Sequence, residues 1–309
     1  MSHDVNPPVG AGADPVDWAV VWATIEPQVR KLSTKAAVNY GLSERDLLIS
    51  ARLHLPRLGL EEISSPSAIM AEVNRIAERT RSIRWTYLPT PIHYEPSPLK
   101  HDSVQFTSIE SNMAQVIHER FHYVGSFREG LHFGLYDDDL KGPYDLPIVM
   151  ATLSELDVEH LRSLIPTLSD HAKGLVLSRV YSFDHAPPNC ISYLLGRVTN
   201  WLKTNLPQVR ALFTYVNPNL GFTGVSYRAA NWKEIGEKSI SYRYIDSNYA
   251  SARQCVLSEE GQQCLIKRST YRLLPLKIWS YAIPSMRAGQ RLRVPYGSGS
   301  ATRKPVPSS

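Results

Sequence analysis

The sequence of 309 residues is long enough for one large domain or two ordinary ones, with room for a sizeable buried core. Hydrophobic residues make up 43% of the chain and charged residues 20%, which is ordinary for a globular protein. No apolar run approaches the roughly eighteen residues of a membrane span, and the N-terminus lacks the apolar core of a secretory signal. The three cysteines, Cys190, Cys255 and Cys264, form no CxxC pair. We therefore expect a cytoplasmic protein with no membrane partner and no disulfide framework.

The formal net charge of +5 is unevenly distributed along the sequence. From Glu237 to Ser309 there are twelve Lys or Arg residues against four Asp or Glu residues. A basic segment that also contains Tyr and Trp suits DNA, because cations pair with phosphates and aromatic rings stack on bases. The alternative is that this charge serves solubility alone. The residues expected to contact nucleic-acid phosphates are Lys267, Arg268, Arg272, Arg287, Arg291 and Arg293.

The N-terminal part is predicted to be helical. Residues 1–13 are rich in Pro and Gly and are expected to be disordered, and helical patterns fill residues 14–85. Asp14 is expected to cap the first helix, and Ser43 is expected to cap the second. A third helix begins after Ser65, and its arginines are expected to lie largely on the solvent side: Arg75, Arg79, Arg81 and Arg84.

A linker is predicted at residues 86–102, and beyond it strands alternate with helices. The expected elements are strand 103–109, helix 112–123, strands 131–136 and 145–153, helix 158–164, strand 174–183, helix 188–206, strand 209–216, helix 224–235, and a closing hairpin of 239–244 with 253–257. This order predicts an α/β domain over residues 103–294, with a mixed, mostly antiparallel sheet flanked by helices. Residues 295–309 are expected to form a flexible tail.

The segment HERFH, from His118 to His122, matches the H-E-x-x-H pattern of zinc hydrolases. Two histidines four residues apart on a helix can ligate zinc while the glutamate acts as a base. Against a metal site, Arg120 places a charge inside the motif, and no obvious third ligand follows. The alternative is an ordinary helix C-terminus that ends at Gly125.

A second pattern follows the most strongly buried strand, GLVLSRVYSF. Arg179 lies near the end of this strand, and the next helix begins with Asn189 and Ser192. A helix N-terminus and a guanidinium together form a ready site for a phosphate or carboxylate. Further along the chain, Tyr227 follows two glycines on a short helix, where its hydroxyl could serve as a general acid. The alternative is that Tyr227 only packs against the sheet.

The sequence resembles the Mom family of phage DNA-modification proteins in the order of four motifs. These are HYVGS, the strand with SR-x-Y, PNCIS with its helix, and YVNP…GFTGVSYRAANW. The resemblance spans about residues 115–250 and implies a GNAT fold and acyltransferase-like chemistry on adenine in DNA, which protects that DNA from restriction. It places Arg179, Ser192 and Tyr227 in the active site, with His122 and Tyr123 near the cleft. Asn217 stands where the family usually has Asp, which puts a base or metal-ligand role for this position in doubt.

The resemblance implies an acyl donor such as acyl-CoA by analogy of fold only. The generic phosphate loop, Gln/Arg-x-x-Gly-x-Gly/Ala, is absent after the central strand. Tyr123, Phe127 and Phe222 supply aromatic rings that could hold a base extruded from the duplex.

Three other functions remain open at this stage: a zinc hydrolase, an acyltransferase that acts on protein or tRNA, and a non-enzymatic DNA-binding protein. For the last of these, the segments SERDLL and RIAERTRSIRW are faintly similar to the core helices of bacterial sigma factors, but a helical lid or docking domain with an arginine-rich solvated face is the favoured interpretation of this module. The oligomeric state and the role of the helical module stay undetermined.

Overall fold

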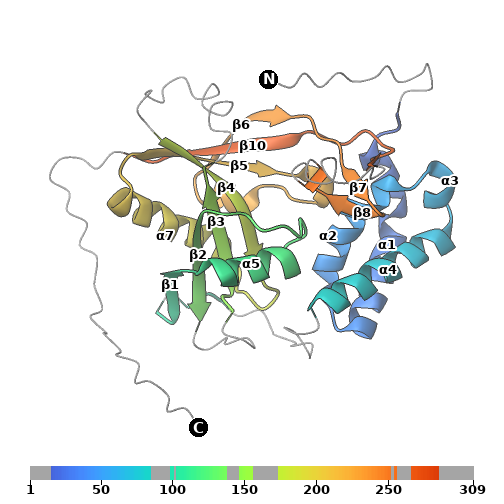
Figure 1. Ribbon diagram of the computed structural model, residues 1–309, viewed down its shortest axis with the longest axis horizontal. Helices are drawn as coiled ribbons and strands as arrows, with labels where there is room; N and C mark the ends of the chain where they lie inside the picture. The colour runs from blue at the N-terminus through green and yellow to red at the C-terminus, as the bar shows by residue number, and fades with distance from the viewer. Residues whose placement is uncertain are drawn as a thin grey trace, which may run out of the picture.

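The computed structural model describes residues 15–84, 98–100, 102–137, 146–155, 173–251, 254–255 and 266–284. N-terminal helices occupy one side of the molecule, and a large twisted sheet with its own helices occupies the other (Figure 1). Within the described ranges, no helix combines the length and the apolar character that crossing a membrane requires. The expected helix 158–164 and the tail 295–309 lie outside the described residues.

The N-terminal helices are α1 (Trp18–Tyr40), α2 (Glu44–His54), the 3-10 turn η1 (Leu55–Arg57), α3 (Leu60–Ile63) and α4 (Pro66–Arg84). The residue at the N-cap position of the first helix is Asp17 and not Asp14, because the helix begins only at Trp18, and the Asp17 side chain makes no capping hydrogen bond. The cap predicted for the second helix is confirmed, since the Ser43 side chain accepts a hydrogen bond from the backbone N–H of Asp46.

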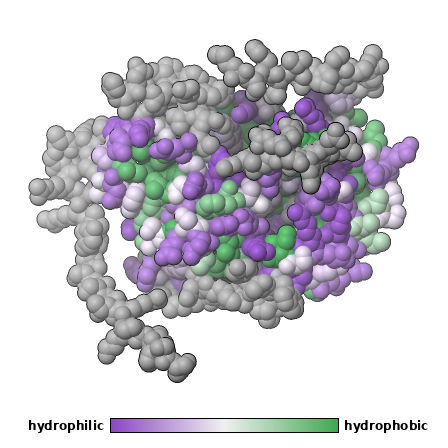
Figure 2. Space-filling model, in the orientation of Figure 1, coloured by the Kyte–Doolittle hydropathy of each residue, from purple (hydrophilic) through white to green (hydrophobic). Residues whose placement is uncertain are grey.

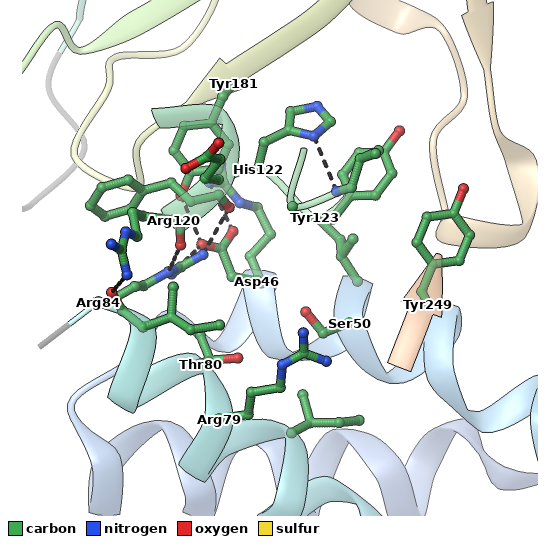
Figure 3. Close-up of a pocket in the computed structure, with 18 of the residues that line it drawn as sticks. Asp46, Ser50, Arg79, Thr80, Arg84, Arg120, His122, Tyr123, Tyr181 and Tyr249 are labelled. Atoms are coloured by element: carbon green, nitrogen blue, oxygen red, sulfur yellow. Dashed lines mark hydrogen bonds and ion pairs between the residues drawn. The ribbon is translucent and has the colours of Figure 1, made fainter. Parts of the chain in front are cut away.

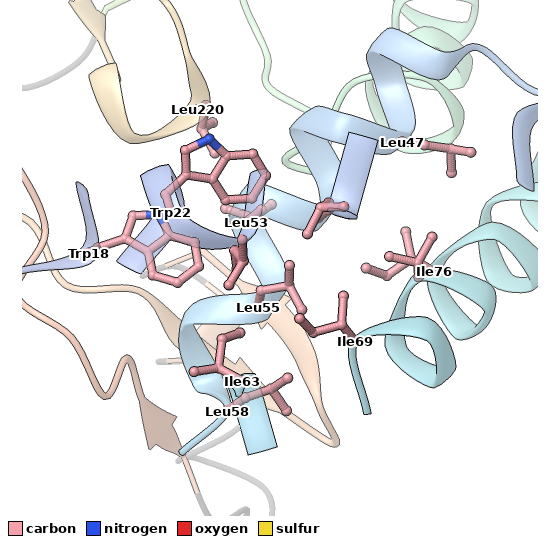
Figure 4. Packing of buried hydrophobic residues seen from close by; sticks show 14 of the residues in the cluster. Trp18, Trp22, Leu47, Leu53, Leu55, Leu58, Ile63, Ile69, Ile76 and Leu220 are labelled. Carbon is pink, nitrogen blue, oxygen red and sulfur yellow. The ribbon is translucent and has the colours of Figure 1, made fainter. Parts of the chain in front are cut away.

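The core of these helices is completed by residues from the C-terminal part of the chain. Leu53, Leu55 and Ile69 pack with Trp18 and Trp22 (Figure 4). The buried rings that close the same cluster come from far along the sequence: Tyr242, Tyr244 and Tyr271. These rings are carried by or lie beside a small sheet of order β8-β7-β9, formed by Arg243–Ile245 (β7), Asn248–Ala250 (β8) and Lys267–Arg268 (β9).

The large sheet has seven strands in the order β1-β2-β3-β4-β5-β10-β6. They are β1 (Val104–Ser108), β2 (Leu131–Asp137), β3 (Val149–Ser154), β4 (Lys173–Ser182), β5 (Val209–Val216), β6 (Lys233–Lys238) and β10 (Leu276–Ala282). Every neighbouring pair is antiparallel except β4 with β5, which is parallel. The predicted class, a mixed and mostly antiparallel sheet flanked by helices after an N-terminal helical module, is confirmed.

Helices cover both faces of this sheet. Helix α5 (Ser111–Arg120) packs with Met150, whereas α7 (Cys190–Asn205) packs with Ala151, and successive residues of a strand point to opposite faces. The short η4 (Pro218–Leu220) and α8 (Val225–Ala229) follow β5.

The parallel pair opens toward its C-terminal end. Pairing joins Lys173–Val176 of β4 to Val209–Phe213 of β5, and β4 then continues unpaired with β5 to Ser182. On the other edge of β4, the register with β3 shifts, because Leu177 faces Leu153 and Arg179 faces Thr152. One extra residue, Ser178, therefore bulges from β4 where the two parallel strands separate.

The C-terminal region departs from the expected elements. The helix expected at 224–235 ends at Ala229, because Asn231 adopts a positive φ of 63° and β6 begins at Lys233. A hairpin is formed by β7 and β8; of the segment 253–257 expected to complete it, the structure describes only residues 254 and 255, which are helical. The basic segment also supplies β10, which inserts between β5 and β6.

The expectation for Arg84 is wrong: its side chain is buried, not solvated. The guanidinium contacts Asp46 of α2 and the carbonyl oxygens of Arg120 and Phe121 at the end of α5. The helix pattern alone leaves this residue on the outer side, but the contact with α5 covers that side.

Candidate active site

A cavity of about 270 Å³ lies where β4 and β5 separate. Its walls come from the ends of α5, β4 and β5, from the first turn of α7, and from the loop between η4 and α8. Four of the residues singled out in the sequence line it: His122, Tyr123, Arg179 and Tyr227. The fold thus brings together side chains that are as much as about a hundred residues apart in the chain.

Arg179 is a partly buried cation that has no carboxylate partner among the residues the structure describes. Its guanidinium donates to the carbonyl oxygen of Ser178 at 2.8 Å and to the Ser126 hydroxyl at 3.2 Å. Its Nε is buried and has no hydrogen-bond partner in the described part of the chain. Burial lowers the pKa of Arg179 from its ordinary value, and the nearby Arg128 acts in the same direction. A buried guanidinium with an unused donor favours an anion or an oxygen acceptor in the cavity.

Tyr227 approaches the same gap from α8. Its hydroxyl is hydrogen-bonded to Thr214, whose own hydroxyl donates to the carbonyl oxygen of Leu177 at 2.9 Å. Burial raises the pKa of Tyr227 above its usual range, so this phenol keeps its proton at neutral pH. The side chain is therefore a hydrogen-bond and proton donor at the point where β4 and β5 part.

A glycine allows α8 to come this close to the sheet. Gly224 has a φ of 73° at the start of α8, and a Cβ added there would lie 2.7 Å from the indole ring of Trp279. No L side chain is readily accommodated at this position, both because of the ring beneath and because of the left-handed backbone. The second glycine of GFTG thus fixes the approach of Tyr227.

His122 and Tyr123, which follow the end of α5, form one wall of the cavity. The two rings stack with centroids 4.4 Å apart. The backbone N–H of Val124 donates to Nδ1 of His122 at 3.2 Å, which leaves the proton of the neutral ring on Nε2. Burial first, then Arg179 and His118, lower the pKa of His122 well below its ordinary value, so the ring is neutral.

His118, the other histidine of HERFH, is occupied by other contacts. Its Nδ1 accepts the backbone N–H of Arg128 at 3.2 Å, and its Nε2 lies 3.0 Å from the Thr152 hydroxyl. That hydroxyl in turn lies 2.9 Å from Nδ1 of His132. In the described ranges, no three His, Cys, Asp or Glu side chains are placed to hold a metal ion. Both nitrogens of His118 are therefore engaged in a buried network and not aimed at a shared ligand with His122.

Three other predicted site residues lie outside the cavity. The Asn217 side chain is buried, donating to the Tyr242 hydroxyl at 2.8 Å and accepting from the backbone N–H of Asn219 at 3.1 Å. Asn189 precedes α7 with a φ of 67°, and its side chain caps nothing. The Ser192 hydroxyl donates to the carbonyl oxygen of Asn189 at 2.9 Å, and Ser192 does not line the cavity although the preceding residue, Ile191, does.

The predicted nucleic-acid contacts divide into three groups. Lys267 and Arg268 are exposed on β9. Arg272 forms an ion pair with Asp17, with nitrogen–oxygen distances of 2.6 and 3.0 Å. The remaining three lie outside the described residues: Arg287, Arg291 and Arg293.

Two contributors to the site were missed by sequence analysis. Ser126 holds Arg179 from the loop after α5, and Thr214 links Tyr227 to β4. Both are hydroxyl residues in unremarkable local patterns. Only the pairing of distant strands gives them a role, so no signal within the sequence could have identified them.

Comparison with known proteins places these features in a family. The model of the Mom protein family matches residues 103–281, which include β1 to β10 and the whole cavity of the β4–β5 gap. None of the curated proteins matches the sequence.

Among solved structures, an N-acetyltransferase from Staphylococcus aureus Mu50 is 10% identical, with a TM-score of 0.36, over 59% of this chain and 99% of that chain. Arabidopsis thaliana NAA60 in complex with acetyl-CoA is 10% identical, with a TM-score of 0.37, over 58% of this chain and 98% of that one. The spermidine N-acetyltransferase from Vibrio cholerae, in complex with CoA and spermine, is 10% identical, with a TM-score of 0.34, over 59% of this chain and 97% of that one.

Proposed function

The chain belongs to the Mom protein family, and we propose that it is a transferase that modifies a nucleic-acid base, an adenine in DNA. One observation carries this proposal most directly. An uncompensated guanidinium, Arg179, and a protonated phenol, Tyr227, line one cavity at the parting of two parallel strands. An anion-binding group and a proton donor at one point are what a group transfer needs.

The residues of the gap fit the reactive end of an acyl donor. Arg179 has an unused N–H there, and Tyr227 offers a proton. The first turn of α7, at Asn189–Ser192, would hold the anionic part of the donor, because first-turn N–H groups have no helical partners. When bound, acyl-CoA or a related donor supplies an activated acyl group. The missing phosphate loop leaves this helix start and Arg179 as the candidate anion site.

Each residue has a distinct part in the proposed chemistry. Arg179 binds and orients the donor, and Tyr227 gives its proton to the leaving group. His122, neutral with its proton on Nε2, and Tyr123 close the wall toward the acceptor. An adenine amine inside a duplex cannot reach this buried gap, so the base must be extruded from the helix.

The exposed cations Lys267 and Arg268 are proposed to contact phosphates, which would hold the DNA without reading its sequence. Membership of the family further favours a role in protecting phage DNA from restriction inside a bacterial cell. The zinc-hydrolase alternative gains no support from the contacts of His118, whose two nitrogens are already engaged.

Nucleoside mass spectrometry of DNA from expressing cells tests the proposal. We expect a modified adenosine with the wild-type protein and at least about a hundredfold less of it with Tyr227→Phe at equal expression. Unmodified DNA accompanied by a modified tRNA or a modified protein would contradict the proposed substrate and leave transfer chemistry standing. Unchanged DNA, tRNA and protein would contradict the transferase proposal itself.

A further inference from the structure

A second cavity, of about 230 Å³, lies between the N-terminal helices and the large sheet. Helices α2 and α4 form its floor, and the ends of α5 and β4 together with β8 form its other walls. It adjoins the cavity of the β4–β5 gap, because both are lined by His122, Tyr123 and Phe222. Hydrophilic side chains prevail on the surface over α2 and α4 (Figure 2).

One wall of the second cavity is aromatic. Tyr123 and Phe222 lie with ring centroids 5.7 Å apart, and Tyr249 of β8 lines the same space. Tyr123 and Tyr249 stand across the cavity from Ser50 and Arg79 (Figure 3). Aromatic rings of this kind offer stacking faces for a base.

The opposite wall carries a cation with no partner. Among the arginines that line the cavity, Arg84 is paired with Asp46, and Arg75 is paired with Glu72. The Arg79 side chain has neither an ion pair nor a hydrogen bond within the described ranges, and burial, with Arg75 acting in the same direction, lowers its pKa. Arg79 is thus the one of these three whose charge is left for a ligand.

Buried and hydroxyl-bearing groups continue this polar wall. His54 lines the cavity, and its buried Nδ1 has no hydrogen-bond partner among the described residues. Ser50 and Thr80 add hydroxyl groups that can donate or accept. A space with stacking rings on one side and a free guanidinium, an imidazole and hydroxyls on the other matches a nucleotide.

The sizes of the two cavities are consistent with one cavity binding the donor and the other binding the acceptor. Both are smaller than the roughly 300–1,000 Å³ of pockets that enclose drug-sized ligands. The acceptor and the reactive end of the donor can therefore occupy separate cavities, which share the wall formed by His122, Tyr123, Val180, Ile191 and Phe222. The gap with Arg179 and Tyr227 suits the reactive end of the donor, which leaves the second cavity for the acceptor.

We propose that the second cavity binds the acceptor nucleotide, with its base against Tyr123, Phe222 and Tyr249 and its phosphate on Arg79. The inference rests on the proposed function and assigns the N-terminal helices a part in substrate binding. The base enters from the side of α2 and α4, and its amine faces the β4–β5 gap across the common wall.

Binding of short single strands tests the assignment without requiring turnover. The probe is a labelled oligodeoxynucleotide with one adenine, compared by fluorescence anisotropy with the same strand carrying an abasic site. Arg79→Gln should weaken binding of both strands about tenfold and reduce the salt slope by about 0.7, as for one lost phosphate contact to a single strand. Tyr249→Leu should lower the preference for adenine over the abasic site by about tenfold.

The matched control is Lys35→Gln, which removes one exposed charge from α1, away from the cavity. It should leave strand binding unchanged, and melting temperatures should show that all variants fold. Calorimetric binding of CoA should be the same in the wild type, Arg79→Gln and Tyr249→Leu. Loss of CoA binding with intact strand binding in Arg79→Gln overturns the proposal and assigns the cavity to the donor. Unchanged binding of both ligands also overturns it.

These outcomes are separable from failure of the proposed function. If cellular DNA stays unmodified while Arg79→Gln loses strand binding selectively, the nucleotide site stands and the transfer reaction does not. If DNA is modified and Arg79→Gln binds and modifies it normally, the transfer reaction stands and the nucleotide site does not.

Discussion

Two regions of this molecule each bury an arginine, and the two arginines have opposite surroundings. Arg84 is 6% exposed, donates to Asp46 at 2.7 Å and also donates to two carbonyl oxygens at the end of α5. Arg179, at the β4–β5 gap, has hydroxyl and carbonyl partners, and within the described part of the chain it has no carboxylate partner and its Nε is unused. A buried charge is costly unless it is paired, so the first arrangement holds the helices to the sheet. The second keeps a charge available for a ligand.

The largest expected effect follows from removing the anion of the paired region. Asp46→Ala leaves Arg84 buried without its carboxylate and removes the acceptor of the Tyr181 hydroxyl. We expect the free energy of unfolding to fall by about 3–5 kcal/mol in urea denaturation. Asp184→Ala is the control, because Asp184 is an exposed partner of Arg45 and should contribute less than about 1 kcal/mol. Equal effects of the two substitutions would remove the distinction between a buried and a surface pair.

The next effect concerns catalysis and should leave stability almost untouched. Tyr227→Phe keeps the ring contacts with Trp232 and Trp279 and removes only the hydroxyl. Turnover should fall by about 10²–10⁴-fold, the usual contribution of a general acid, while the free energy of unfolding changes by about 1 kcal/mol or less. Turnover is measured as modified nucleoside formed per enzyme, and stability is measured as the melting temperature. Tyr281→Phe, on β10 outside the cavity, is the control and should retain turnover. A fully active Tyr227→Phe protein would leave Tyr227 with a packing role only.

A third substitution tests whether Arg179 binds a ligand or, like Arg84, stabilises the fold. Arg179→Lys retains a positive charge but loses the planar fork of donors. Donor affinity measured by calorimetry should fall by about tenfold, and the free energy of unfolding should change by no more than about 1 kcal/mol. A loss of stability as large as that of Asp46→Ala, with donor affinity intact, would make Arg179 a structural arginine like Arg84.

The contributions of the two regions to stability should be lost at different pH values as the pH is lowered. Burial, then Arg179 and His132, lower the pKa of His118 to about 3 from an ordinary value of 6.5. Because the unfolded chain binds this proton first, the associated stability is complete above about pH 6.5 and is lost as the pH falls toward about 3. For Asp46, burial opposes ionisation, but Arg84 and Arg45 outweigh it and hold its pKa below the ordinary value. Its contribution is complete above about pH 4 and is lost only below that.

Melting temperatures between pH 7 and pH 3 check this order. In Asp46→Ala, the melting temperature should fall between pH 6.5 and pH 5 as it does in the wild type, and it should fall less than in the wild type below pH 4. In His118→Gln, the fall in melting temperature between pH 6.5 and pH 5 should be smaller than in the wild type. A wild-type melting temperature that is constant from pH 7 to pH 5 would contradict the burial of neutral histidines beside the site.

Local signals in the sequence located much of this architecture. The Ser43 cap, the central strand at residues 174–183 and the helix after PNC follow from capping chemistry and periodicity, and they are present. The order of motifs also indicated that Arg179 and Tyr227 would meet. Asn217 and Ser192 were grouped with them, although neither lines the cavity. Proximity in a motif does not determine which way a side chain points.

Features that depend on distant contacts were not accessible from the sequence. Arg84 has the pattern of a solvated helix residue, and its burial becomes favourable only through Asp46 of α2 and the carbonyl oxygens at the end of α5. Strand β10 lies in a basic stretch, and its place between β5 and β6 depends on partners about forty or more residues away. The aromatic wall at Tyr249 exists because the small sheet folds back onto the N-terminal helices.

The smallest expected effect belongs to cations that are neither buried nor paired. Lys267 and Arg268 are exposed on β9, so replacing both with Gln should leave the melting temperature unchanged. Truncation before them cannot test this, because it also removes β10, which pairs with both β5 and β6 in the large sheet. If both contact phosphates, affinity for duplex DNA should fall several-fold for every sequence alike, and the salt slope should decrease by about two. Lys31→Gln with Lys35→Gln is the matched control, because it removes the same charge from the exposed side of α1. Equal losses in the two double variants would mean that net charge alone governs DNA binding, whereas a loss confined to one base sequence would indicate base readout at β9.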